Sequence, residues 1–152
     1  MSALIIFLTD NASSTQIANH LLCCDADFVP PLSHRIKIPD YAQKISRNAV
    51  RFEAWSGTTL IGLVAAYCND PKSSIAYITN VSVLHSWIGQ GIATQLLKQC
   101  GNHMKNLGLR QICLQVGVNN TPAIMLYAKC GYTEDRTNSS FLDMHLYLDS
   151  GK

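Results

Sequence analysis

The chain has 152 residues, of which 47% are hydrophobic and 14% are charged. This composition fits one globular domain with a substantial core and excludes an intrinsically disordered chain. The 12 Lys plus Arg and 10 Asp plus Glu residues give a formal net charge of +2, too small for a surface that would wrap nucleic acid. No apolar run is continuous over the length that a bilayer requires, so we expect neither nucleic acid nor a membrane as a partner.

We expect no targeting segment at the N-terminal end. Arg35 is the first Lys or Arg, so the apolar run at residues 3–8 lacks the basic flank of a signal peptide. The sequence therefore predicts a cytoplasmic protein, a monomer or a homodimer, whose single domain spans residues 1–152. Its six cysteines show no C-x-x-C pair and no regular spacing, which indicates core thiols rather than disulfides, and no metal is expected.

Hydrophobic periodicity predicts the elements of the first half. In chain order these are a strand at residues 3–8, a helix around residues 17–22, a loop at residues 25–38, a short helix from Pro39, and strands at residues 49–56, 59–69 and 74–84. Gly57-Thr58 is a hairpin signal between the first two of these last strands, so the three are expected to form an antiparallel meander. In the third, alternating apolar and β-branched side chains from Ile75 to Val83 are expected on one face.

The second half begins with the longest predicted helix, an apolar stripe from Gly91 to the left-handed stop at Gly108. It is followed by a strand at residues 112–118, a helix capped by Asn120 or Thr121 that ends at Gly131, and strands at residues 132–136 and 141–148. The resulting order, βααβββαβαββ, predicts an α/β fold with a mixed sheet.

The junction before the long helix carries a candidate binding site. Gly89 and Gly91 allow a tight turn that leaves several amide N–H groups unpaired at the helix N-terminus. Such an end attracts a phosphate or diphosphate through the amides and the helix dipole, and Thr94 adds a hydroxyl one turn later. Without further context, the same pattern is more often an ordinary tight turn.

Two motifs supply that context. Ile88-Gly89-Gln90-Gly91-Ile92-Ala93 aligns with the pattern R/Q-x-x-G-x-G/A, and residues 120–132 match N-x-x-A-x-x-L-Y-x-x-x-G-F/Y at every fixed position. With the order of elements around them, these motifs make the chain resemble the GCN5-related N-acetyltransferase (GNAT) family. The specific motifs cover about residues 75–132. Ile88 departs from the usual Arg or Gln, and His85 stands where a proline is common. Both departures concern the affinity for the coenzyme.

The resemblance implies the GNAT fold, a mixed, mostly antiparallel sheet with splayed central parallel strands, flanked by helices. It implies acetyl-CoA as cosubstrate and direct acetyl transfer to a primary amine in a ternary complex. Strands at residues 81–83 and 112–118 would separate to admit the pantetheine, and the Val81 amide would face the acetyl carbonyl. The implied coenzyme-binding residues are Val81, Ser82, Val83, Ile88, Gly89, Gln90, Gly91, Ile92, Ala93, Thr94, Asn120, Ala123 and Tyr127.

The resemblance also makes Tyr127 the acid that protonates the departing thiolate, although a tyrosine at this helical spacing could simply pack in the core. No residue stands out as the base. Glu53, on a strand expected to be central, is the best single candidate, with a solvated or ion-paired glutamate as the alternative. Asp143, His145 and a water chain that needs no dedicated base remain open.

The acceptor would be recognised largely by the loop between the first two helices. Phe28 and two prolines can wall a pocket, Asp25 or Asp27 can hold an ammonium, and Arg35 can bind a carboxylate or phosphate. The candidate acceptor-binding residues are Phe28, Ser33, Arg35, Tyr77 and Asp143. Because few acidic residues disfavour a polycationic acceptor, we expect a small-molecule amine such as an amino sugar or sugar nucleotide. The alternative function is an acyl-CoA-binding regulatory module on the same fold without turnover.

Overall fold

The computed structural model describes residues 4–70 and 72–148, and its elements follow the predicted order βααβββαβαββ. The strands are β1 (Ile6–Thr9), β2 (Ala49–Ser56), β3 (Thr59–Tyr67), β4 (Ile75–Val83), β5 (Gln111–Gly117), β6 (Thr133–Thr137) and β7 (Phe141–Tyr147). The helices are α1 (Ser14–Cys24), α2 (Ile38–Asn48), α3 (Ile92–Asn106) and α4 (Thr121–Lys129). Short 3-10 turns are η1 (Asp25–Asp27), η2 (Leu32–His34) and η3 (His85–Trp87). The first two lie in the predicted loop.

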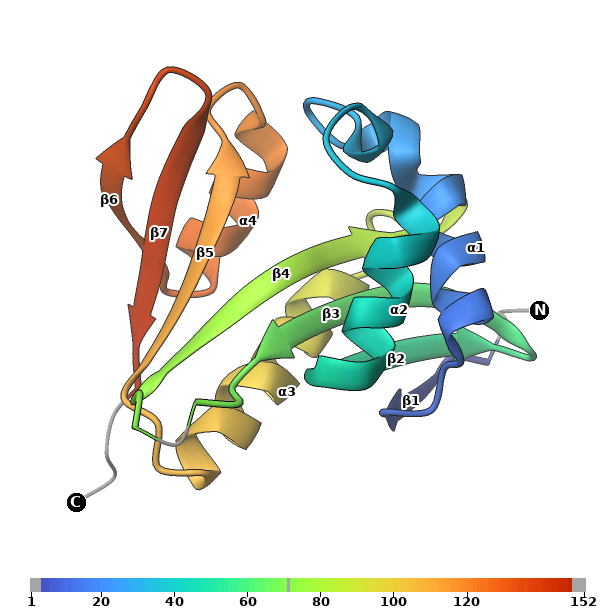
Figure 1. Ribbon diagram of the computed structural model, residues 1–152, viewed down its shortest axis with the longest axis horizontal. Helices are drawn as coiled ribbons and strands as arrows, with labels where there is room; N and C mark the ends of the chain where they lie inside the picture. The colour runs from blue at the N-terminus through green and yellow to red at the C-terminus, as the bar shows by residue number, and fades with distance from the viewer. Residues whose placement is uncertain (1–3, 71, 149–152) are drawn as a thin grey trace.

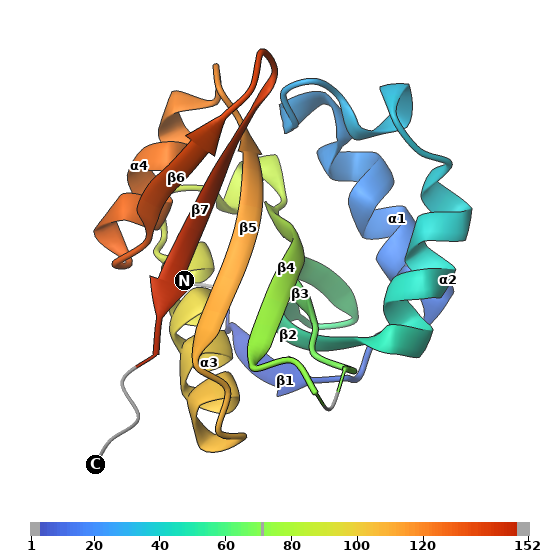
Figure 2. The same cartoon turned by 60° about the vertical axis from the view of Figure 1, so that its left-hand side comes forward.

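The strands form one 7-stranded sheet in the order β1-β2-β3-β4-β5-β7-β6 (Figure 1). Every neighbouring pair is antiparallel except β4 and β5, which run parallel. Their pairing extends only from the Ile75/Gln111 pair to the Ile78/Leu114 pair, and beyond it the two strands separate into a V (Figures 1 and 2). The expected splayed GNAT sheet is thereby confirmed.

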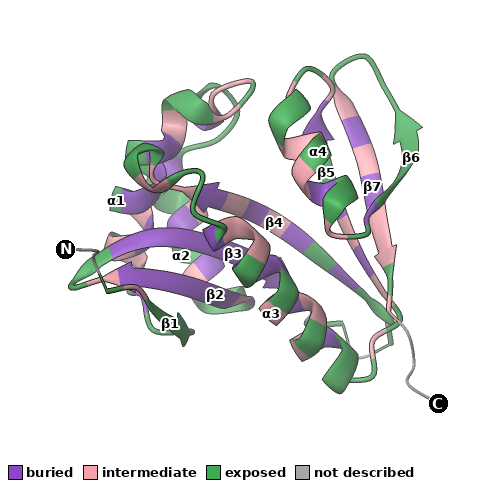
Figure 3. Ribbon diagram, turned by 180° about the vertical axis from the view of Figure 1, so that it is seen from behind, coloured by how far each residue is buried: buried purple, intermediate pink, exposed green. Residues whose placement is uncertain are grey.

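Two hydrophobic cores hold the layers together. The larger one contains the buried stripe of α3, including Leu96, Cys100 and Met104, against β2 to β5 and β7, with Tyr127 of α4 joining it. The other packs α1 and α2 on the opposite face of β2 and β3, which are buried along most of their length (Figure 3). In the described part of the chain, no helix has the length and apolar content needed to cross a membrane.

Strand β4 departs from the predicted alternation. Its pairing with β3 shifts between Ala65, opposite Asn80, and Ala66, opposite Ile78, so Thr79 is an extra residue in a β-bulge. Ile75 and Tyr77 therefore lie on the opposite face from Val81 and Val83, and the expectation of one continuous face is wrong. The bulge turns the Asn80 and Ser82 side chains, both buried, toward α1, where Ser82 contacts His20.

The prediction that the cysteines are core thiols holds for two of the six. Cys24 and Cys100 are buried, whereas Cys68, Cys113 and Cys130 are half-buried and Cys23 is exposed. All six are free, as expected. Adjacent Cys23 and Cys24 differ because consecutive helical residues point about 100° apart, so only one of them can face the core.

Candidate functional site

The V between β4 and β5 opens into a cavity of about 670 Å³. The α3 N-terminus and α4 line one side of it, and the segment between α1 and α2 lines the other (Figure 2). Every predicted coenzyme-binding residue except Gln90 contributes to the lining. A cavity of this size suits an elongated small molecule that can enter between the separated strands.

The α3 N-terminus presents unpaired amides to this cavity. Gly91 caps the helix in the left-handed conformation, with φ of 77°, and no side chain caps the helix at that position. The bond from the Gln95 N–H to the Gly91 carbonyl, 3.0 Å, is the first of the helix. The amides of the preceding turn therefore lack a helical acceptor. Together with the helix dipole, they form an anion site that needs no basic side chain.

We expect Ile88→Arg to tighten acetyl-CoA binding about 10-fold at low ionic strength. Ile88 is 57% exposed and lines the cavity beside the anion site, so a guanidinium there can make one charge-assisted contact to a phosphate. Calorimetry should show that the gain fades at high salt. Ile88→Gln, which adds hydrogen bonding without charge, is the matched control. Binding that is unchanged or weaker at low salt would mean that residue 88 points away from the bound anion.

Tyr127 reaches the cavity from α4. Its ring is buried and meets the ring of Tyr132 edge to face, with centroids 6.0 Å apart, while its side chain also lines the cavity. Burial raises the pKa of Tyr127, with a smaller contribution from Cys130. The phenol is therefore protonated at neutral pH and can only act as a proton donor there. At the start of the same helix, the Asn120 side chain accepts a hydrogen bond from the Ala123 amide, 3.3 Å, as a capping residue does.

The segment between α1 and α2 closes the far side of the cavity. Phe28, Val29 and Leu32 line it, and the Val29 carbonyl lies so close to Gly117 at the end of β5 that a β-carbon at Gly117 would overlap it. Asp25 does not line the cavity. Its carboxylate accepts bonds from the Ser33 amide, 2.7 Å, and the Ser33 hydroxyl, 2.6 Å. Ser33 therefore organises the segment and is not placed to contact an acceptor.

Charged residues are few on the acceptor side. Arg35 lines the cavity and lies over the Phe141 ring, 5.1 Å from the ring centroid, which positions its guanidinium by a cation–π contact. Asp27 supplies the one carboxylate among the described lining residues and lies 3.6 Å from His85 Nδ1. Tyr77 lines the cavity, whereas Asp143 lines an adjoining groove that shares Tyr77 with it, and contacts Gln115 of the cavity wall at 3.2 Å.

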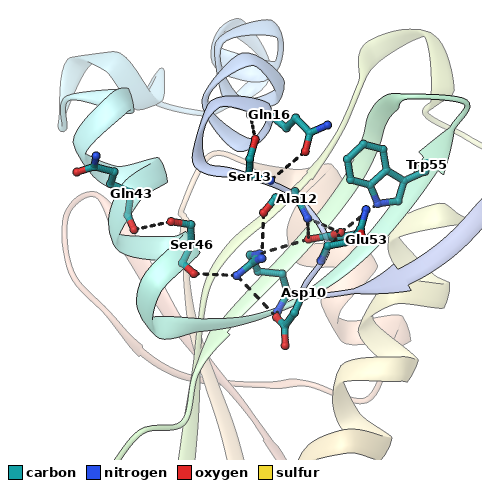
Figure 4. Close-up of polar contacts among 10 residues, drawn as sticks. Asp10, Ala12, Ser13, Gln16, Gln43, Ser46, Glu53 and Trp55 are labelled. Carbon is teal, nitrogen blue, oxygen red and sulfur yellow. Dashed lines mark hydrogen bonds and ion pairs between the residues drawn. The ribbon is translucent and has the colours of Figure 1, made fainter.

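Glu53 is not placed to act as a base. Its side chain is fully buried outside the cavity, where both carboxylate oxygens accept bonds from the Ala12 amide at 3.1 and 3.0 Å (Figure 4). The Asn11 amide, the Trp55 indole and the Arg51 guanidinium complete its hydrogen bonding at 3.1, 3.0 and 3.3 Å. These bonds hold β1 and the start of α1 against β2. Glu53 is therefore a structural, ion-paired glutamate, the alternative to a catalytic base.

The other two candidate bases do not line the cavity either. His145 Nδ1 is 2.6 Å from Asp135, and its Nε2 is 3.0 Å from the Thr133 hydroxyl, which ties β7 to β6. Neither His145 nor Asp143 lines the cavity.

Sequence reasoning missed a buried polar group behind the cavity wall. His20, on α1, contacts Ser82 of β4, although the two are 62 positions apart in the chain. The sequence did contain a pattern that places His20 in the core. Residues 17, 20, 21 and 24 follow the helical i, i+3, i+4, i+7 spacing, so the His20 ring lies on the same buried face as Ile17, Leu21 and Cys24.

Comparison with known proteins agrees with this geometry. The family model described as the acetyltransferase (GNAT) family matches residues 15–132. A mycothiol acetyltransferase from Corynebacterium glutamicum is 28% identical over 101 residues, 66% of this chain and 34% of that protein. A streptothricin acetyltransferase from Escherichia coli is 35% identical over 65 residues, 43% of this chain and 37% of that protein. The chain thus spans about a third of the length of the curated relatives that it matches.

Solved structures share the fold over nearly the whole chain. The ribosomal-protein-S18-alanine N-acetyltransferase from Escherichia coli has a TM-score of 0.76 at 15% identity and covers 96% of this chain and 95% of its own. The PaiA N-acetyltransferase from Thermoplasma acidophilum, in complex with coenzyme A, has a TM-score of 0.71 at 14% identity. The likeness covers 93% of this chain and 99% of the PaiA chain. At these identities the likeness concerns the fold.

Proposed function

Because the chain belongs to the acetyltransferase (GNAT) family, we propose that it transfers an acetyl group from acetyl-CoA to the primary amine of a small molecule. The observation that carries the proposal is the cavity between separated β4 and β5, with an unpaired helix N-terminus and a protonated tyrosine on the same side. The α3 amides hold the diphosphate, and the free edges of β4 and β5 pair with the amides of the pantetheine.

The chain's own residues have separate tasks in this reaction. Val81 pairs with β3 but lies beyond the point where β4 pairs with β5, and its amide is assigned to the acetyl carbonyl, where a hydrogen bond stabilises developing negative charge. Tyr127 gives its proton to the thiolate as the C–S bond breaks. Binding of both substrates in one cavity allows direct attack, so no covalent acetyl-enzyme is required.

The acceptor side favours an amine that also carries an anionic group. Arg35 is held over Phe141 and faces the cavity, and Asp27, the one carboxylate among the lining residues that the structure describes, already lies beside His85. A polycationic acceptor would need several free carboxylates there. Amino sugars and sugar nucleotides combine an amine with a polar or phosphorylated body, and two relatives are named for small molecules, mycothiol and streptothricin.

A panel of primary amines tests the proposal through thiol release from acetyl-CoA. We expect turnover with small amines, and a lower KM for those bearing phosphate or carboxylate. Arg35→Gln should raise that KM about 10- to 100-fold, the worth of a charged hydrogen bond, and leave acetyl-CoA affinity unchanged. Arg47→Gln, at an exposed position on α2, is the matched control.

Two other outcomes would change the assignment. Acetyl-CoA binding without turnover on any amine would favour the regulatory module, in which the same cavity senses acyl-CoA. Equal KM values for anionic and neutral amines in the wild-type protein would remove Arg35 from acceptor recognition and leave the transferase activity itself in place.

A further inference from the structure

His20 is a buried imidazole with a defined tautomer. It is 3% exposed, its Nδ1 lies 2.8 Å from the Leu60 carbonyl of β3, and its Nε2 lies 2.8 Å from the Ser82 hydroxyl of β4. A carbonyl only accepts hydrogen bonds, so Nδ1 carries the proton and Nε2 of the neutral ring is an acceptor. Burial lowers the pKa of His20 to about 4, which keeps the ring neutral at pH 7. The other titratable contact of Nε2 is the Cys24 thiol, 3.7 Å away.

Ser82 joins this ring to a second acceptor. Its hydroxyl oxygen lies 2.8 Å from His20 Nε2 and 2.8 Å from the Asn80 side-chain oxygen. The hydroxyl has one proton, so it can satisfy only one of these acceptors at a time. A further proton on Nε2 would satisfy both, because the imidazolium would then donate to Ser82 and Ser82 would donate to Asn80. Burial opposes a lasting charge on this ring, and the Cys24 thiol can also donate to the neutral Nε2, but the hydrogen bonds of the array allow one proton to be taken up transiently without a heavy atom moving.

The array meets the cavity through Ser82 and Asn80. Both line it, while His20 lies behind them and does not. The bulge at Thr79 turns these two side chains toward α1, on the acceptor side. The Tyr41 hydroxyl fixes the bulge by donating to the Thr79 carbonyl at 2.6 Å. Strand β4 itself carries no carboxylate, and Asp27, the one carboxylate among the described lining residues, belongs to η1 and lies 3.6 Å from His85.

We propose that Ser82, backed by His20 and Asn80, takes the proton that the attacking amine loses, an inference that rests on the proposed acetyltransferase activity. The lone pair of the neutral amine forms the new C–N bond. One N–H proton passes to the Ser82 oxygen while the proton of Ser82 passes to His20 Nε2. The C–S electron pair leaves with the sulfur, which takes the Tyr127 proton. His20 then returns its proton to water and Tyr127 regains one, so both residues are restored.

The test compares Ser82→Ala, His20→Asn and the double variant. Asparagine can keep a donor toward the Leu60 carbonyl but lacks the acceptor at Nε2. We expect kcat to fall about 10- to 100-fold in each single variant, and no further in the double variant, because the two residues act as one unit. The solvent-isotope proton inventory should be curved in the wild type, where two protons move together, and linear in Ser82→Ala.

Controls separate this proposal from a loss of folding or of coenzyme binding. Acetyl-CoA affinity by calorimetry should change little in Ser82→Ala, because β4 is assigned to the pantetheine through its backbone and the Ser82 hydroxyl is turned toward His20. Ser56→Ala, which removes a hydroxyl at the end of β2 outside the cavity, should keep full kcat. If His20→Asn does not fold, the kcat and the proton inventory of Ser82→Ala test the relay on their own.

Three results would overturn the relay. These are full kcat in Ser82→Ala, losses that multiply in the double variant, and an acetyl group on Ser82, which would make the hydroxyl a nucleophile. In each of these three cases the wild-type protein still acetylates the amine, so the proposed acetyltransferase activity is unaffected. A wild-type protein that binds acetyl-CoA and acetylates no amine contradicts the proposed function and removes the relay with it.

Discussion

Tyr127→Phe should lower kcat for acetyl transfer about 10- to 1000-fold, with little change in acetyl-CoA affinity. The ring packs in the larger core beside Tyr132, and phenylalanine preserves that packing. What disappears is the phenol proton that we assign to the departing thiolate. The loss should appear in kcat under conditions where chemistry limits turnover, because the hydroxyl acts as the C–S bond breaks and not while the coenzyme binds. Water that replaces the phenol would bring the effect toward the lower end.

Tyr132→Phe is the matched control for this prediction. Its hydroxyl is buried, has no hydrogen-bond partner in the described part of the structure, and does not line the cavity. Removing it should leave kcat unchanged and raise the free energy of unfolding by about 1 to 3 kcal/mol, the cost of an unsatisfied buried hydroxyl. Full turnover in Tyr127→Phe with a good acceptor would leave Tyr127 as a packing residue only.

Gly91→Asp should weaken acetyl-CoA binding about 100-fold or more. Space is open where a β-carbon would lie, so the side chain fits, but its carboxylate would sit among the α3 amides that we assign to the diphosphate. The protein should still fold, because aspartate tolerates a left-handed φ better than most residues and is a good helix cap. Calorimetry at two salt concentrations should show a smaller loss at high salt.

Gly91→Asn separates charge from shape in this experiment. Asparagine matches aspartate in size, tolerates the φ of 77° and caps helices equally well, but it is neutral. We therefore expect a much smaller loss than for Gly91→Asp. Equal losses in the two variants would mean that sterics and not an anion govern the position, and unchanged affinity in both would place the phosphate site elsewhere.

The elements that follow local patterns are predictable from this sequence. Strand β2 begins and ends where expected, at residues 49 and 56, because the Gly57-Thr58 turn fixes its end. Helix α3 follows from its apolar stripe and from Gly91, whose missing side chain permits the left-handed cap. The site on this helix could be located for the same reason, since its amides are a property of the local backbone.

What depends on distant contacts could not be predicted. The bulge in β4 leaves the alternation of residues 75–83 unbroken in the sequence, so nothing local shows that the two ends of the strand face opposite ways. Glu53 has the local setting of a central-strand carboxylate, but its amide partners Asn11 and Ala12 are about 40 positions away and saturate both oxygens. His20 finds Ser82 only through tertiary packing.

The most direct measurement follows one turnover in two stages. The protein is first mixed with acetyl-CoA alone and examined by intact-protein mass spectrometry, and an amine that supports turnover is then added while thiol and N-acetyl product are measured together. Direct transfer in the cavity predicts no acetylated protein in the first stage and, in the second, one thiol for each N-acetyl product. Bound acetyl-CoA with no amine-dependent thiol release, across the whole panel of amines, would contradict the account.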